Sequence, residues 1–570
     1  MHAGAAADDS RGRRSGHADT GVLDAPVACI LTRADIDPMH RILASVLLTA
    51  CAATIACAQA PAAKPAAAPA IATLPSLVVL VTVDQLRGDY FDRFGSQLNG
   101  GLGRLSRGGA WFSNAHHDHA ITETAPGHAS LLSGRFPRST GITANRAGVF
   151  DNTARVLGSP DQLGASPRQF RGTTLVDWLR AGNPRSRAFS VSMKDRGAIL
   201  PIGRLAEQVY WYVPDGRFST SAYYADSLPQ WVTRFNNRRL PQSYAGRSWE
   251  PLLAEGAYRE RDSVIFEGGG ADVVFPHPIS ADSAVAASQL IGTPWMDDVV
   301  LAFALDGLEA LSIGKGPHTD VMAVSVSATD IIGHRYGPDS KEVHDQILRL
   351  DRALGVFLDS LYRLRDSSRV VVVLTGDHGV GRIPELAADS VKPPPKRVSM
   401  ASLVPAIRTM LRAANVDTMA ITVDFQVITA NRAVFSKGRR TADEVLADVA
   451  KLIRATPGVA RVDRFADLLK ADTTRDAVAR RWTHQFPPDA GVDLVVTQTP
   501  MTLFGTITAS HGSPYDYDSH VPLIFHGAAF KAGRYPEFVR TVDLAPTVAA
   551  VVGAKPLERL DGVVLKRALK

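Results

Sequence analysis

The chain has 570 residues, of which 45% are hydrophobic and 21% charged, and its formal net charge is +6. This length allows one large domain with insertions, and the slightly basic balance is compatible with anionic substrates without identifying one. All three cysteines, Cys29, Cys51 and Cys57, lie near the start of the chain. If that part is removed, disulfides and thiolate metal ligands are excluded.

The N-terminal part is predicted to be an export sequence. We expect residues 1–38 to be an extension that does not belong to the protein, because a signal peptide begins at Met39. Residues 39–58 have a short polar start, an apolar core and a small-residue cleavage site, as a secretory signal does. They are too short for a transmembrane anchor, and no later segment approaches the roughly 20 apolar residues of a spanning helix. The expected location is therefore periplasmic or secreted.

A second interpretation of this segment involves a lipid. Leu48 to Cys51 resembles a lipoprotein cleavage box, and cleavage there would leave an anchor on Cys51. In either case residues 59–75, which are rich in alanine and proline, are expected to form an extended linker.

Runs of β-branched residues predict buried parallel strands. The runs at 77–83, before Asp330 and before Asp377 are too continuous for half-exposed strands and too short for a membrane helix. A further strand is expected at 189–193, and helices are expected at 98–107 and 341–364. This alternation predicts an α/β fold in which a doubly wound, mostly parallel sheet is flanked by helices.

The predicted catalytic domain covers residues 76–570 and contains two insertions. The first, near 206–294, is rich in aromatic residues and glycine. The second, near 384–506, begins with a Pro/Lys-rich stretch and then has its own helix and strand pattern, so we expect a cap or subdomain there.

Acidic residues and histidines follow three of the predicted strands. These are Asp84, the pair Asp330 and His334, and the adjacent Asp377 and His378. The carboxyl ends of parallel strands meet at one edge of a sheet, where open α/β folds bind ligands. The pattern favours a metalloenzyme, although Asp84 alone also fits a helix cap and Asp330 with His334 also fits a salt bridge.

Two details of this cluster are predicted from spacing. Gly333 is expected to allow a tight bend that brings Asp330 and His334 to one metal ion. His511 supplies a further imidazole, with His520 and His526 as competing candidates. His526 lies in an apolar run and is expected to be structural.

Thr124 is the candidate nucleophile. It precedes Pro126 at the expected start of a helix, where an alkoxide would be stabilised by the helix dipole and by a nearby metal ion. The simpler alternative is a threonine that only caps the helix. The neighbouring run His116 to His119 is expected to be a surface turn or a supporting element of the nucleophile loop, not a metal site.

The ordered motifs resemble those of a known superfamily. They are VDQLRGDY, TETAPGHASLLSG, ATDIIGHRYGP, LTGDHG and SHG. Together they resemble the alkaline phosphatase superfamily, specifically the branch that atypical periplasmic alkaline phosphatases with a Lys/Arg pair share with nucleotide pyrophosphatase/phosphodiesterases. The resemblance covers nearly all of the chain after the linker and implies an alkaline phosphatase-like fold.

The resemblance also implies a site with two zinc ions. The first ion is assigned to Asp330, His334 and His511, and the second to Asp84, Asp377, His378 and the Thr124 hydroxyl oxygen. In this scheme Thr124 attacks the phosphoryl group and forms a covalent phosphothreonine, which water then hydrolyses.

Three further residues are implied in substrate binding. Asn145 corresponds to an asparagine that donates to a phosphoryl oxygen, and Lys194 and Arg196 correspond to the pair found in the monoesterases. Two cations favour a monoester, because its phosphoryl group has one more charged oxygen than a diester. Without the resemblance, Lys194 and Arg196 would be an ordinary charged loop.

The expected function is therefore a secreted, zinc-dependent phosphate monoester hydrolase of broad specificity. Its partners are small phosphate esters, no nucleic acid partner is required, and a monomer is expected. The alternative is a phosphodiesterase or nucleotide pyrophosphatase with the same metals. A sulfatase is disfavoured because its nucleophile begins as Cys or Ser, and a catalytically silent scaffold is disfavoured because no ligand is missing.

Overall fold

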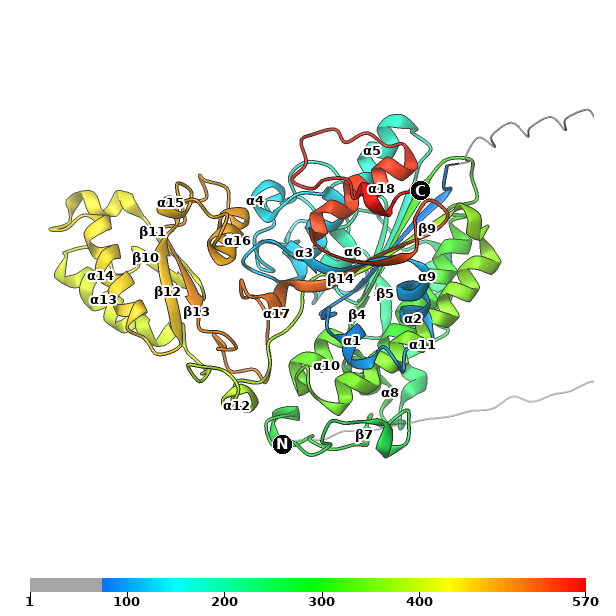
Figure 1. Cartoon of the computed structure of the whole chain (residues 1–570), viewed down its shortest axis with the longest axis horizontal. Coiled ribbons are helices and arrows are strands. Elements are labelled where there is room, and N and C mark those ends of the chain that lie inside the picture. Colours follow the sequence, from blue (N-terminus) through cyan, green and yellow to red (C-terminus); the bar gives the residue numbers. More distant parts are fainter. Residues whose placement is uncertain (1–73) are drawn as a thin grey trace, which may run out of the picture. The chain divides into compact units, whose positions relative to one another are not determined.

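The computed structural model describes residues 74–570, and its centre is a nine-stranded sheet (Figure 1). The strand order is β15-β2-β14-β9-β1-β8-β3-β4-β5. The strands are β1 Leu77–Val83, β2 Ala110–His116, β3 Ala188–Ser192, β4 Gln208–Val213, β5 Arg217–Ser219, β8 Asp320–Val326, β9 Val370–Gly376, β14 His520–His526 and β15 Gly533–Arg540. The central strands β9, β1, β8, β3 and β4 are parallel, whereas β14 and β5 run antiparallel to their neighbours. The predicted mostly parallel sheet is confirmed.

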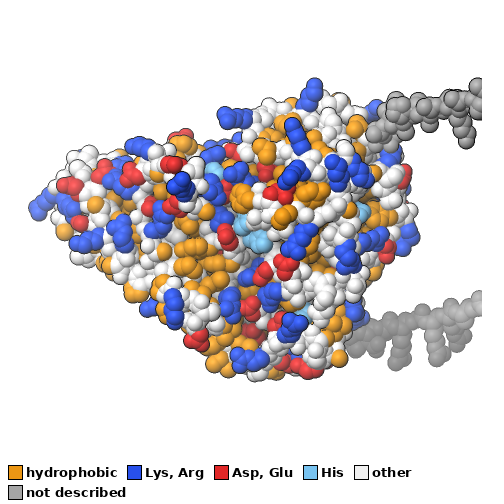
Figure 2. All heavy atoms as spheres, viewed as in Figure 1, with side chains coloured by type: hydrophobic (Ala, Val, Ile, Leu, Met, Phe, Trp, Pro, Cys, Tyr) orange, Lys and Arg blue, Asp and Glu red, His pale blue; other side chains and the backbone are white. Residues whose placement is uncertain are grey.

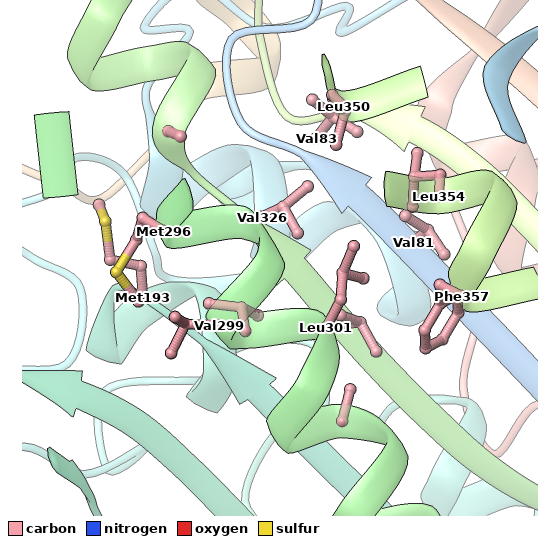
Figure 3. Close-up of a cluster of buried hydrophobic side chains, with 14 of the residues drawn as sticks. Val81, Val83, Met193, Met296, Val299, Leu301, Val326, Leu350, Leu354 and Phe357 are labelled. Atoms are coloured by element: carbon pink, nitrogen blue, oxygen red, sulfur yellow. The ribbon is translucent and has the colours of Figure 1, made fainter. Parts of the chain in front are cut away.

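Strand β1 explains why these runs are apolar without alternation. Val81 and Val83 point to one core, whereas Val78 and Leu80 point to the other. Because successive side chains of a strand face opposite sides, a strand buried on both faces needs apolar residues throughout. Figure 3 shows the first core, where β1 and β8 side chains meet helices α9 and α11.

Helices cover both faces of the sheet. The first core includes side chains of α1 Tyr90–Phe94, α2 Gly101–Gly108, α7 Gln230–Asn237, α8 Ser283–Gln289, α9 Trp295–Ala310, α10 Ala328–Tyr336 and α11 Lys341–Leu364. The second includes side chains of α3 Thr124–Ser133, α5 Leu175–Gly182, α6 Asp195–Ile199 and α18 Leu544–Val552. Short helices α4 Pro137–Thr140, α12 Pro384–Ala387 and α17 Asp516–Ser519 lie in connections.

The first predicted insertion begins later than residue 206. Strands β4 and β5 lie inside that range but belong to the main sheet. The sequence does not show which strands pair with β4 and β5. These two strands at one edge of the main sheet were therefore predicted to be part of the insertion. The two-stranded sheet of β6 Ser248–Trp249 and β7 His277–Pro278 follows.

Residues 384–506 contain a second, four-stranded sheet with its own core. The order is β10-β11-β13-β12, and all neighbouring strands are antiparallel. Its elements, yellow to orange in Figure 1, are β10 Ile421–Asp424, β11 Val427–Ala430, β12 Val459–Arg464, β13 Leu494–Gln498, α13 Val404–Ala413, α14 Ala442–Arg454, α15 Phe465–Leu468 and α16 Ala477–Gln485.

Three expectations fall on residues that the structure does not describe. The extension 1–38, the signal peptide 39–58 and the lipid anchor at Cys51 lie outside the described residues, as does most of the linker 59–75. Among residues 74–570, no helix combines the length and the apolar character that crossing a membrane requires.

Candidate metal centre and active site

Three neighbouring parallel strands end together at the site. Val83 of β1 is in register with Val326 of β8 and with Gly376 of β9. Asp84 and Asp377 are therefore the first residues beyond two adjacent strands, and the Asp84 amide donates to the carbonyl oxygen of Val326 at 2.9 Å. Asp330 lies in the first turn of α10, just after β8. The prediction that these strand ends meet at one edge is confirmed.

The first group of donors is Asp330, His334 and His511, called here the Asp330 cluster. Asp330 Oδ1 lies 3.3 Å from His334 Nε2 and 3.6 Å from His511 Nε2. Asp330 and His334 are one turn apart on α10, so the helix itself puts both side chains on one face. The predicted tight bend at Gly333 is wrong, because the helical period already supplies the approach.

Hydrogen bonds to the backbone orient both histidines of this cluster. His334 Nδ1 lies 2.8 Å from the carbonyl oxygen of Ala509, and His511 Nδ1 lies 2.7 Å from that of Thr122. Because a carbonyl oxygen only accepts, each Nδ1 carries the proton, and each Nε2 of a neutral ring presents a lone pair. The two Nε2 atoms are 3.2 Å apart. Two lone pairs at this distance repel unless a cation lies between them, so the donor set fits a zinc ion.

The second group is Asp84, Asp377 and His378, called here the Asp84 cluster. His378 Nε2 lies 3.5 Å from Asp84 Oδ1 and 3.6 Å from Asp377 Oδ2, and all three side chains are fully buried. Among the described residues, Asp84 Oδ1 and His378 Nε2 have no hydrogen-bond partner. Buried polar atoms without partners are costly, and a bound cation would satisfy them.

The negative charges of the carboxylates in the two clusters also favour bound cations. Burial, followed by repulsion from Asp330 and Asp377, raises the pKa of the Asp84 carboxyl to about 7. Although burial opposes its charged form, the hydrogen bond and charge of Asp330 raise the pKa of His511 to about 9. Carboxylates crowded in a dry site thus favour any positive charge placed among them.

Lys194 supplies one such charge. Its Nζ lies 2.7 Å from Asp84 Oδ2 and 2.6 Å from Asp330 Oδ2, so its ammonium group contacts one carboxylate of each cluster. Arg196 lies in the first turn of α6, beside Asp195 at 3.5 Å, and its buried Nε has no partner among the described residues. The structure therefore brings Lys194 into contact with both clusters, whereas the Arg196 side chain makes no hydrogen bond or ion pair with either cluster among the described residues.

Helix α3, which begins with Thr124, lies against Asp377 of the Asp84 cluster. Thr124 is the first residue of α3, and Glu123 rather than Thr124 occupies the cap position, which corrects the alternative of a simple capping threonine. His128 Nδ1 donates to the Thr124 carbonyl oxygen at 2.9 Å and lies 3.1 Å from Asp377 Oδ2. A Cβ atom on Gly127 would lie only 2.2 Å from the Asp377 carbonyl oxygen. This close approach fixes the start of α3 beside the cluster.

Asn145 is tied to the same helix turn. Its Oδ1 accepts from the Ala125 backbone N–H at 2.9 Å, and its own backbone N–H donates to Glu123 Oε2 at 2.6 Å. Its side-chain NH₂ group has no hydrogen-bond acceptor among the described residues. The amide is therefore oriented by its oxygen and keeps its donor for a ligand.

Gln85 is a site residue that the sequence analysis missed. It is fully buried and has a left-handed backbone with φ of 68°. Its backbone N–H donates to Asp377 Oδ1 at 3.0 Å, and its side-chain Nε2 donates to Asp330 Oδ1 at 2.8 Å. Gln85 therefore forms a hydrogen bond with one carboxylate of each cluster. A Cβ atom on Gly333 would lie 1.8 Å from Gln85 Oε1, so the glycine makes room for Gln85. The only signal in the sequence for this role is that Gln85 directly follows Asp84.

His520 and His526, the competing candidates to His511, belong to neither cluster. His520 Nε2 donates a hydrogen bond to the Ser113 carbonyl oxygen at 2.9 Å, and His526 Nδ1 lies 3.4 Å from the Tyr362 hydroxyl oxygen. The prediction of a surface turn at His116 to His119 is wrong, because all four residues are buried. His117 Nε2 lies 2.9 Å from the carbonyl oxygen of Gly376, directly before Asp377, which agrees with the supporting role. A run of polar residues gave no sign of this burial.

Comparisons with known proteins agree with the site. The sequence profile of the family described as type I phosphodiesterase / nucleotide pyrophosphatase matches residues 78–502. The chain is 31% identical to alkaline phosphatase PhoV of Synechococcus elongatus, over 87% of this chain and 93% of that protein. It is also 31% identical to alkaline phosphatase PhoK of a Sphingomonas species, over 86% of this chain and 91% of that protein.

A solved structure matches the fold. The crystal structure of wild-type alkaline phosphatase PafA superimposes with a TM-score of 0.80 at 27% identity, covering 87% of this chain and 99% of that chain. The chain therefore belongs to the type I phosphodiesterase / nucleotide pyrophosphatase family of the alkaline phosphatase superfamily.

Proposed function

We propose that this protein is a phosphate monoester hydrolase of the alkaline phosphatase type with broad specificity for small phosphate esters. One observation carries the proposal: the Asp330 and Asp84 clusters meet at the start of the helix that bears Thr124, with the Lys194 ammonium between them. The alkaline phosphatases among its relatives support the same activity.

Two zinc ions are the proposed cofactors. The Asp330 cluster would hold one, and the Asp84 cluster together with Thr124 Oγ would hold the other. Zinc supplies positive charge that lowers the pKa of a hydroxyl group or water and stabilises charge on a transferring phosphoryl group. The donors fit because they are all nitrogen or oxygen and because several are buried without partners.

Thr124 is the proposed nucleophile. Its Oγ forms a bond to phosphorus and its hydroxyl proton passes to solvent, while the bond to the ester oxygen breaks. That oxygen leaves with the bonding electron pair and takes up a proton from water. The product is a phosphothreonine. Water then attacks phosphorus and gives up a proton, the bond to Thr124 Oγ breaks, and Oγ takes up a proton, so that free phosphate and threonine result. The start of α3 favours the negative charge that develops on Oγ, because Thr124 is the first residue of the helix, where the helix dipole is positive.

Asn145, Lys194 and Arg196 are the proposed binding residues for the phosphoryl oxygens. The free NH₂ donor of Asn145 suits one non-bridging oxygen. Lys194 is almost buried, so its charge acts in a medium of low dielectric, where it counts for more than at the surface. A monoester dianion gains more from this charge than a diester with one charge does.

A phosphodiesterase is the second candidate, because the matching family profile carries that description. The test is kcat/KM for p-nitrophenyl phosphate against bis-p-nitrophenyl phosphate on the zinc-loaded enzyme at alkaline pH. A strong preference for the monoester is the expected result. Preference for the diester would reject the monoesterase and leave the metal ligands and Thr124 in a phosphodiesterase.

Export is part of the proposal and is supported by the sequence of residues 39–58 alone. The monomeric state and the choice between free release and a lipid at Cys51 likewise stay predictions.

A further inference from the structure

A cavity of about 420 Å³ opens beside the Asp330 cluster. His511 and Glu123 are among the residues that line it, and so are the apolar side chains of Phe425, Met501 and Phe504. Phe425 lies in the turn between β10 and β11 of the four-stranded sheet, so this second sheet contributes a wall to a cavity that begins at a proposed metal ligand. Figure 2 shows hydrophobic side chains gathered on one face of the molecule beside a group of histidines.

The backbone of this cavity is unusual. Phe425 has φ of 46° and Met501 has φ of 61°, a left-handed conformation that only glycine and asparagine adopt readily. A two-residue hairpin turn with positive φ at its first position normally carries glycine there, but the turn that pairs Asp424 with Val427 carries Phe425. Phe425 also leaves 65% of its surface exposed. Strained backbone and an exposed aromatic ring together are typical of a ligand site rather than of a core.

One part of the cavity wall is polar. Gln426 Nε2 donates to Gln498 Oε1 at 2.8 Å, and both side chains are almost buried. Among the described residues, no partner binds the other amide oxygen or the other amide NH₂ group of this pair. Whichever way the amides are turned, one acceptor and one donor stay available to a ligand in the cavity.

The position of the cavity relative to Thr124 suggests what enters it. In an in-line displacement, the leaving oxygen lies opposite the nucleophile across phosphorus. The start of α3, which bears Thr124, is packed against Asp377 of the Asp84 cluster, so the leaving oxygen is directed toward the Asp330 cluster, whose His511 lines the cavity. We propose that this cavity is the subsite for the leaving group and that it selects phosphate esters with an aromatic, hydrogen-bonding organic group over small alkyl esters. This proposal rests on the proposed function.

The test compares phenyl phosphate and methyl phosphate on the zinc-loaded full chain and its Phe425→Ala variant. We expect kcat/KM for phenyl phosphate to fall by about 5-fold or more, since aromatic contact is lost. For methyl phosphate it should stay unchanged. Comparing each ester with itself in the two proteins removes the intrinsic difference in leaving-group reactivity. Met419→Ala is the matched control, because Met419 is 67% exposed on the same subdomain and does not line the cavity.

Two results would overturn the subsite while the phosphatase proposal stands: no change for either ester, or an equal fall for both. If the wild-type protein hydrolyses neither ester, the proposed function fails. Calorimetric binding measurements with phenylphosphonate and methylphosphonate then test the subsite independently of hydrolysis. Tighter binding of phenylphosphonate that Phe425→Ala removes would support it, and equal binding of the two phosphonates would reject it.

Discussion

The two donor clusters differ most in the solvent exposure of their side chains. Every side chain of the Asp84 cluster is fully buried, whereas His334 and His511 of the Asp330 cluster are 26% and 7% exposed. The Asp84 cluster is closed by the start of α3, and the Asp330 cluster borders the cavity of Phe425. One site thus has a dry side suited to holding a nucleophile and an open side suited to the leaving group and to water.

The strongest test of the dry side is Thr124→Ala. Removing the proposed nucleophile should lower kcat/KM for p-nitrophenyl phosphate by at least about 10³-fold, while zinc content stays near that of the wild type because the carboxylate and imidazole donors of both clusters remain. Steady-state kinetics and metal analysis check this. Substantial activity in Thr124→Ala would contradict the covalent route.

Lys194 joins the two sides, so its removal should distinguish substrates. Lys194→Ala, with Arg196→Ala, should lower monoester hydrolysis by about 10²- to 10³-fold and diester hydrolysis far less, because the extra charged oxygen loses its partner. The measurement is kcat/KM for both substrates. Lys315→Ala is the control, since Lys315 is half exposed and paired with Glu309. Equal losses for monoester and diester would refute the discriminating role.

Gln85 also contacts both clusters, through hydrogen bonds of uncharged groups. Gln85→Asn keeps a residue that tolerates the left-handed backbone but shortens the reach to Asp330. We expect zinc affinity and kcat/KM to fall by about 10- to 100-fold, as for other groups that orient metal ligands. Unchanged zinc affinity in a competition titration would show that Gln85 only fills space.

The smallest expected effect is a difference in the order of metal loss. The Asp330 cluster is more exposed, so its ion should leave first during dialysis against a chelator. Zinc content and activity followed together should show activity lost with the first ion. Loss of both ions at one rate would mean that exposure does not separate the clusters.

The sequence predicted some parts of this structure closely. The strand Leu77–Val83 and the helix Lys341–Leu364 have the predicted limits, because burial on two faces or one face leaves a clear apolar pattern. The positions of Asp84, Asp330 and Asp377 were visible for the same reason, since each follows such a strand, whereas His511 lies in the connection between β13 and β14. Gln85 was not visible, because its role depends on a left-handed backbone and on space left by Gly333.

Burial of polar residues was the other failure. His117 and Asp118 look like surface residues, yet Asp118 is buried against Arg480 and Arg540 at 3.0 and 2.9 Å. Such compensation by distant charges cannot be seen in local sequence. Strands β4 and β5 were assigned to an insertion because membership of a sheet depends on a neighbour far along the chain.

The most direct test of the two-metal site is a crystal structure of the zinc-loaded protein with anomalous scattering measured at the zinc edge. Two peaks are expected, one among Asp330, His334 and His511 and one among Asp84, Asp377 and His378, separated by about 3.5–4 Å. A single peak, or zinc bound away from these residues, would contradict the two-metal site.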